Sequence, residues 1–313
     1  MMRKLVYALG IALVTGASAF WVLTMPQEVG GVVLAGLEPG NVAKGEQVFW
    51  ASGCASCHAA PGASGEQRKV LAGGHELASD FGTFVAPNIS PSSQGIGDWT
   101  LENFANAMLK GVGKKGEHLY PSFPYTSYTR MEPQDVVNLF AYMKTLPPSS
   151  NIAPAHKLGF PFNLRRGIGI WKQLYLTQTP AVELVDASDQ IRRGQYLTEV
   201  LGHCGECHTP RNAIGGLDKS RWLSGALSPE IGNDGKRGTI PNITAGEGGI
   251  SDWSESEIAY ALQSGFTPDF DSLGGSMADV VANMAHLSDE DRNAIAAYLK
   301  AIPAHPNGYS TNR

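Results

Sequence analysis

The sequence predicts a mainly α-helical protein built from two tandem copies of one unit, which follow an N-terminal hydrophobic segment. A Cys-x-x-Cys-His motif occurs at residues 54–58 and again at residues 204–208, an offset of 150 residues. Other segments repeat around it, and the offset reaches 156 between Tyr142 and Tyr298. Apolar residues near the motifs follow helical spacing, and no strand-like alternation persists. A chain of 313 residues has room for two domains that each bury a core.

The N-terminal hydrophobic segment is assigned to residues 1–30. Arg3 and Lys4 precede an apolar run from Leu5 to Thr24, which is long enough to cross a bilayer as a helix. We expect a membrane anchor whose basic end lies in the cytoplasm, with the body on the periplasmic side of the bacterial inner membrane. Residues 17–19, Ala-Ser-Ala, resemble a cleavage site, so the alternative is a removed signal peptide and a soluble periplasmic protein.

The two units are expected at residues 38–150 and 188–305, with a linker at 151–187. In each unit one helix leads into the cysteine motif, a second follows an Asp-Trp pair, and a third ends the unit. The second helices begin at Thr100 and Ser254, which are good N-caps, and end near Gly111 and Gly265. The expected helices are 45–51, 100–110 and 132–143 in the first unit, and 190–201, 254–264 and 288–299 in the second.

The repeated Cys-x-x-Cys-His motif is the attachment site of a c-type haem. Cys54, Cys57, Cys204 and Cys207 are all the cysteines of the chain, so none remains for a disulfide. Each pair is expected to form thioethers to the vinyl groups of one haem. The histidine that ends each motif, His58 or His208, is expected to be the proximal iron ligand. The sequence therefore predicts two covalently bound haem c groups.

Two other uses of a Cys-x-x-Cys pair fit less well. A zinc site would need two further ligands at finger-like spacing. A thioredoxin-type redox pair would need an alternating strand and helix context. The repetition of the motif inside a repeated unit favours haem over both.

The distal iron ligands are predicted from loop position. Met277 lies 12 residues after Gly265 and follows two glycines, so it is the predicted ligand in the second unit, with Met284 as the alternative. The residue 12 positions after Gly111 is a phenylalanine, which cannot bind iron. Met131 is therefore the predicted ligand of the first haem. His118 is its main competitor, and His75 is another candidate.

Paired loops are expected to support the haems. The backbone carbonyls of Pro87 and Pro241 are candidates to accept the free N–H of the two proximal histidines. Trp99 and Trp253 are expected either to reach haem edges or propionates or to be ordinary core residues. The linker segment 158–171 is unusually apolar. It is expected either to pack along both units or to touch a membrane or partner subunit.

The sequence resembles the class I cytochrome c domain over about residues 38 to 305. Residues 119–128, the two Pro-Asn-Ile motifs and residues 275–281 further resemble the cytochrome c subunits of periplasmic alcohol, gluconate and molybdenum-hydroxylase-type aldehyde dehydrogenases. Many relatives of the alcohol dehydrogenase type have Met where this chain has Phe123, and such subunits often carry three haems.

The resemblance implies an electron-transfer protein and not an enzyme in its own right. It would take electrons from a periplasmic dehydrogenase and pass them to the respiratory chain through a cytochrome, a quinone or an oxidase. The alternative is a peroxidase-like dihaem enzyme with one open haem. The net charge of −5 and the lack of a basic cluster speak against nucleic-acid binding.

Overall fold

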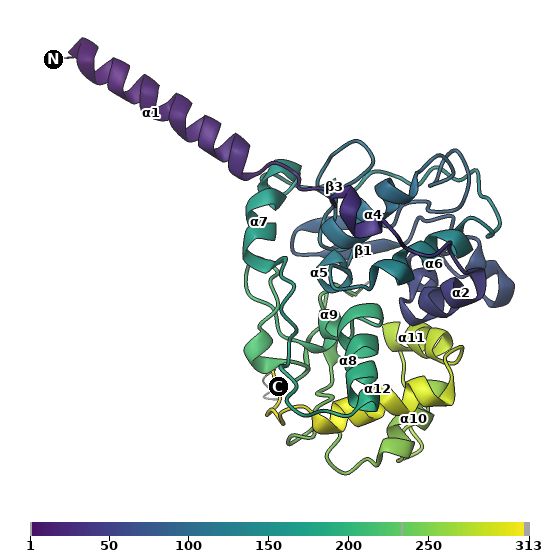
Figure 1. Ribbon diagram of the computed structural model, residues 1–313. Coiled ribbons are helices and arrows are strands. Elements are labelled where there is room, and N and C mark those ends of the chain that lie inside the picture. The colour runs from purple at the N-terminus through teal and green to yellow at the C-terminus, as the bar shows by residue number, and fades with distance from the viewer. Residues whose placement is uncertain (1, 233, 310–313) are drawn as a thin grey trace.

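The computed structural model describes residues 2–232 and 234–309 and confirms the mainly α-helical fold. Helix α1 (Met2–Leu23) projects from the body of the molecule in Figure 1. Purple and blue elements gather in the upper half of the body, and green to yellow elements gather in the lower half. The two halves of the sequence therefore form two adjoining lobes.

The elements follow the repeated order that the sequence predicts. The first lobe contains η1 (Gly31–Leu34), α2 (Val42–Ala51), α3 (Cys54–His58), η2 (Gly65–Lys69), β1 (Glu76–Ser79), β2 (Gly82–Val85), α4 (Leu101–Lys110), α5 (Tyr125–Tyr128) and α6 (Pro133–Met143). The connecting segment contains β3 (Lys157–Leu158), η3 (Arg165–Gly167) and α7 (Ile168–Tyr175). The second lobe contains α8 (Asp189–Gln195), η4 (Tyr196–Leu201), α9 (Gly205–His208), η5 (Lys219–Arg221), β4 (Ala226–Leu227), β5 (Thr239–Ile240), α10 (Glu255–Ser264), α11 (Ser276–Met284) and α12 (Asp289–Ala301).

Each lobe is held by a close crossing of its first and last long helices. A Cβ at Gly45 in α2 would lie 2.0 Å from the carbonyl oxygen of Asn138 in α6. A Cβ at Gly194 in α8 would lie 1.9 Å from the carbonyl oxygen of Ala294 in α12. Only glycine permits this approach, so the same contact sets the helix pair in both lobes.

The predicted helix ends are confirmed where capping residues mark them. Thr100 and Ser254 each form a reciprocal capping box, at the starts of α4 and α10 respectively. Gly111 and Gly265 end these helices with φ values of 60° and 79°, in the left-handed region that favours glycine. Pro133 begins α6 as predicted.

Two local features differ from the sequence expectation. The first lobe has an antiparallel hairpin of β1 and β2 with β3 at its edge. Strands of two to four residues are too short to show an alternating pattern. The helix expected over 190–201 changes at Tyr196, because η4 is a π-helical turn. This wider turn carries the buried Glu199.

Candidate haem sites

Each cysteine motif forms a short helix, α3 in the first lobe and α9 in the second. The four thiols are free and partly buried. Burial raises the pKa to about 12 for Cys54 and Cys204 and to about 11 for Cys57 and Cys207. At neutral pH the four thiols are therefore protonated when nothing is attached to them. The described residues also contain no cluster of three or more His, Cys, Asp or Glu side chains suited to a metal ion.

The proximal histidines are oriented by the carbonyls that the sequence singled out. His58 Nδ1 lies 2.9 Å from the carbonyl oxygen of Pro87, and His208 Nδ1 lies 2.8 Å from that of Pro241. A carbonyl only accepts, so Nδ1 carries the proton and Nε2 keeps its lone pair for iron. Burial also lowers the pKa of both imidazoles, which favours the neutral form that coordinates metal.

A glycine joins each histidine to its proline loop. The Gly73 amide donates to the His58 carbonyl at 2.7 Å, and the Gly225 amide donates to the His208 carbonyl at 2.8 Å. Both glycines have positive φ, 70° and 84°. A Cβ at Gly73 would lie 2.5 Å from the Pro87 carbonyl carbon. A side chain at Gly73 would therefore separate the loop from the histidine it orients.

The asparagine of each Pro-Asn-Ile motif ties the same loop to the chain beyond the last helix. Asn88 Nδ2 donates to the carbonyls of Ser149 and Asn151, at 3.0 and 2.8 Å. Asn242 Nδ2 donates to the carbonyl of His305 at 2.8 Å. The repetition of the motif was the only sequence signal for this tether.

The structure places the predicted distal ligands differently in the two lobes. Met131 is 3 % exposed and lies in the core of the first lobe, just before α6. Met277 is partly buried and is the second residue of α11, so its expected place in a loop is wrong. Gly275 precedes this helix with a φ of 59°, which lets the chain turn there. Met284, the alternative, is buried at the end of α11.

His118 is engaged on the side of the first lobe that meets helix α1. Its Nε2 lies 2.9 Å from the carbonyl oxygen of Thr24, and its own carbonyl accepts from Arg165 at 2.9 Å. These contacts give His118 a structural role at the end of α1. They favour Met131 over His118 as the distal ligand of the first haem.

The two cysteine motifs contact each other's lobe in an equivalent way. The third residue of the first motif, Ser56, accepts from Asn283 Nδ2 at 2.7 Å. The third residue of the second motif, Glu206, accepts from Ser127 Oγ at 3.2 Å and from Thr126 Oγ1 at 2.9 Å. Ser127 and Asn283 are equivalent positions, 156 residues apart. The motif of each lobe therefore faces the segment before the last helix of the other lobe.

A buried carboxylate joins both lobes to the connecting segment. Glu199 in η4 is 0 % exposed and pairs with Arg130 of the first lobe at 2.6 Å. Its other oxygen accepts from Tyr298 Oη at 2.6 Å. The backbone amides of Ala181 and Val182 donate to it at 2.8 and 3.2 Å. No sequence pattern indicates this group, because its partners are distant along the chain.

A tryptophan ring packs directly on the second motif. A Cβ at Gly205 in α9 would lie 2.0 Å from the Trp222 ring. The Trp222 indole N–H is buried and lies towards the Tyr298 hydroxyl. Trp99 and Trp253, expected to reach haem edges or propionates or to be ordinary core residues, are partly buried against the core.

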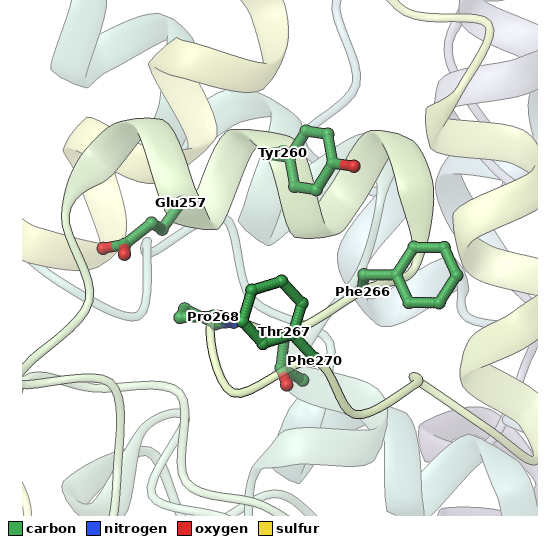
Figure 2. Close-up of a pocket in the computed structure, with 6 residues that line it drawn as sticks. All are labelled: Glu257, Tyr260, Phe266, Thr267, Pro268 and Phe270. Atoms are coloured by element: carbon green, nitrogen blue, oxygen red, sulfur yellow. The ribbon is translucent and has the colours of Figure 1, made fainter.

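A surface hollow of about 340 Å³ lies between α10 and the loop after it. Figure 2 shows Tyr260, Phe266 and Phe270 around it. Its lining contains no Cys, His or Met among the described residues. This hollow is therefore separate from the groups that would hold iron.

Comparison with known proteins decides the family. A family model described as Cytochrome c matches residues 42–147. A "Diheme cytochrome c-type" protein of Cereibacter sphaeroides is 54 % identical over 305 residues, which cover 97 % of this chain and 99 % of that protein. The chain belongs to the dihaem c-type cytochromes. This cytochrome thus has the two covalent haems and the tandem cytochrome c domains that the sequence predicts.

Other relatives are subunits of larger enzymes. The fructose dehydrogenase cytochrome subunit of Gluconobacter japonicus is 36 % identical, over 84 % of this chain and 53 % of that protein. The cytochrome c subunit of the quinone-type alcohol dehydrogenase of Gluconobacter oxydans is 35 % identical, over 85 % of this chain and 56 % of that protein. This cytochrome spans about half the length of these two subunits.

These relatives confirm an electron-transfer role for this cytochrome. Both dehydrogenase relatives are described as cytochrome subunits and not as catalytic subunits. The comparisons give no support to the peroxidase-like alternative. The cytochrome is therefore an electron carrier.

Proposed function

We propose that this cytochrome accepts electrons from a periplasmic dehydrogenase subunit and passes them to a cytochrome, a quinone or an oxidase of the respiratory chain. The observation that supports this proposal most is the cross-pairing of the lobes, in which Ser56 hydrogen-bonds to Asn283 and Glu206 hydrogen-bonds to Ser127. It holds each motif against the other lobe, so an electron that enters at one haem would have a short route to the other. The names of the dehydrogenase relatives support the choice of donor.

We propose a domain division and a ligand set to go with this role. The cytochrome domains are residues 38–150 and 188–305, joined by the linker 151–187. Each haem supplies a one-electron ferric/ferrous couple. The first is held by Cys54, Cys57, His58 and Met131, and the second by Cys204, Cys207, His208 and Met277. The protein excludes water and fixes each imidazole through its proline carbonyl. A haem held by both a histidine and a methionine would have no iron position left for a substrate.

We propose that α1 remains as a membrane anchor that holds the body of the protein on the periplasmic side of the inner membrane. It has a mean hydropathy of 1.9 over its best 18-residue window, with none of that window buried against the body. Arg3 and Lys4 lie at the N-terminal end of α1, which is the end farthest from the body. Cleavage as a signal peptide is the alternative, and the N-terminal mass of the mature protein distinguishes the two.

The relay is tested by optical spectroscopy of the full-length, haem-loaded protein. We expect a methionine–iron charge-transfer band from two haems in the ferric state, and no binding of carbon monoxide in the ferrous state. Met131→Leu and Met277→Leu should each remove half of the band. His118→Gln is the control and should leave the band unchanged. A high-spin haem that binds carbon monoxide in the unaltered protein would contradict a pure relay.

A further inference from the structure

We propose that residues 160–174 form a membrane shelf, a surface that rests on an anionic lipid bilayer beside the end of α1. The proposal rests on the anchor proposed above and goes beyond it, because it fixes how the haem-bearing body sits on the membrane. The shelf consists of five exposed apolar side chains: Phe160, Phe162, Leu164, Ile170 and Leu174.

The shelf is unusually exposed for side chains of this kind. Phe160 is 81 % exposed, Leu174 is 62 % exposed and Leu164 is 57 % exposed. Single exposed apolar residues are ordinary on a protein surface, but a group of this size within 15 residues marks an interaction site. Leaving these apolar side chains in water is unfavourable, so we expect another surface to cover them.

The connecting segment hydrogen-bonds to the C-terminal end of α1 and packs against it. Arg166 Nε donates to Thr24 Oγ1 at 2.8 Å, and the Arg166 guanidinium lies 4.1 Å from the ring centre of Trp21. Gln173 donates from its side-chain amide to the carbonyl of Leu23. A Cβ at Gly169 would lie 2.8 Å from Thr24 Cα. Figure 1 shows α7 beside the inner end of α1.

The direction in which α7 faces follows from its buried side. Gly169 and Lys172 are buried, and Lys172 Nζ donates to the carbonyls of Lys110 and Gly111 at 2.7 Å each. Ile170 and Leu174 are exposed and four residues apart, so they share the other face of the helix. Gln173, the residue before Leu174, hydrogen-bonds to the Leu23 carbonyl of α1. The apolar face of α7 therefore adjoins the place where α1 leaves the bilayer.

The rest of the shelf also meets α1. A hollow of about 540 Å³ is lined by Phe20 of α1 together with Pro161, Leu164 and Arg166. The anchor and the shelf are thus one continuous surface. A tryptophan at the end of a spanning helix, here Trp21, is typical of the bilayer interface.

The charge of the segment identifies the occupant as lipid. Residues 160–174 contain no acidic side chain, and two of their basic side chains, Arg165 and Arg166, are partly exposed. Basic residues flanking exposed Phe and Leu are the composition of interfacial segments that bind anionic lipid. The structure therefore favours a bilayer over a partner subunit as the cover of this surface.

The test uses the full-length, haem-loaded protein in nanodiscs of phosphatidylethanolamine and phosphatidylglycerol that contain a photoactivatable phospholipid. After irradiation, lipid adducts are mapped by peptide mass. We expect adducts in residues 160–174 as well as in α1. We expect none in residues 266–270, where Phe266 and Phe270 are also exposed, at 51 % and 93 %. The double variant Phe160→Asp, Leu174→Asp should lose the shelf adducts and keep those in α1.

The matched control is Phe266→Asp, Phe270→Asp, which should change neither set of adducts. Adducts in α1 without adducts in 160–174 would overturn the shelf and leave the anchor standing. Adducts in neither region would overturn both. Equal labelling of 266–270 would also overturn the shelf, because lipid would then reach any exposed aromatic residue.

Discussion

Replacing Glu199 by alanine removes the carboxylate that joins the two lobes to the connecting segment. In the folded protein its oxygens receive the Arg130 guanidinium and the Tyr298 hydroxyl, both at 2.6 Å, and the amide of Ala181 at 2.8 Å. The Arg130 side chain is only 14 % exposed, so Glu199→Ala leaves a largely buried, unpaired cation. Removing one partner of a buried ion pair costs about 3–5 kcal/mol. We expect a loss of that size in the free energy of unfolding.

The assay is urea unfolding of the haem-loaded protein, followed by tryptophan fluorescence and by circular dichroism. Glu199→Gln keeps the volume and some hydrogen bonds, so its cost should be smaller, about 1.5–3 kcal/mol. Glu76→Ala is the matched control, because the Glu76–Lys157 pair is exposed and should contribute at most about 1 kcal/mol. A Glu199→Ala protein within 1 kcal/mol of the unaltered one would refute the reasoning.

The same group predicts an effect of acid. Burial alone would raise the pKa of Glu199, but the Arg130 charge and the donated hydrogen bonds outweigh it and hold the pKa below its ordinary value. The folded state therefore binds this proton less readily than the unfolded state. Its contribution to stability is fully present above the ordinary glutamate pKa and is lost as the pH falls through the folded-state pKa. Glu199→Gln should flatten the acid limb of the stability curve.

Three further predictions follow from single residues. In the same urea assay, Gly73→Ala should lower the free energy of unfolding by about 2–4 kcal/mol, because its backbone is left-handed and a Cβ would overlap Pro87. The control is Gly62→Ala, which has a similar φ but open space around it and should cost only about 1–2 kcal/mol. Burial lowers the pKa of Lys172 to about 7, so the folded state binds fewer protons than the unfolded one above that pH. Stability should then rise from pH 7 towards the ordinary lysine pKa, and Lys172→Met should abolish the rise. Asn283→Ala should cost about 1–3 kcal/mol, because Arg68 and Ser56 of the first lobe lose their hydrogen bonds to the second lobe's Asn283. An unchanged urea midpoint would count against the cross-pairing.

Sequence reasoning located the parts of the site that depend on local spacing. The Pro87 and Pro241 carbonyls were predicted from the repeat, and both lie within hydrogen-bond distance of their histidines. The ends of α4 and α10 at Gly111 and Gly265 were likewise predicted, because a helix end depends on the residues next to it in the sequence.

Contacts between distant segments were not predictable in this way. Glu199 meets residues 69 and 99 positions away, and Asn283 meets a residue 227 positions away. Arg166 lies in the linker segment 158–171 that is unusually apolar, but its partner Thr24 lies 142 positions earlier. Such pairs depend on how the lobes and the anchor come together, and neither periodicity nor capping encodes that arrangement.

The most direct test of the account is the mass of the mature protein and of its tryptic peptides. The account predicts an intact mass increased by two haem groups. It also predicts that the peptides that contain residues 54–58 and 204–208 each carry one of them. A bare polypeptide, or haem on only one of these two peptides, would contradict the account.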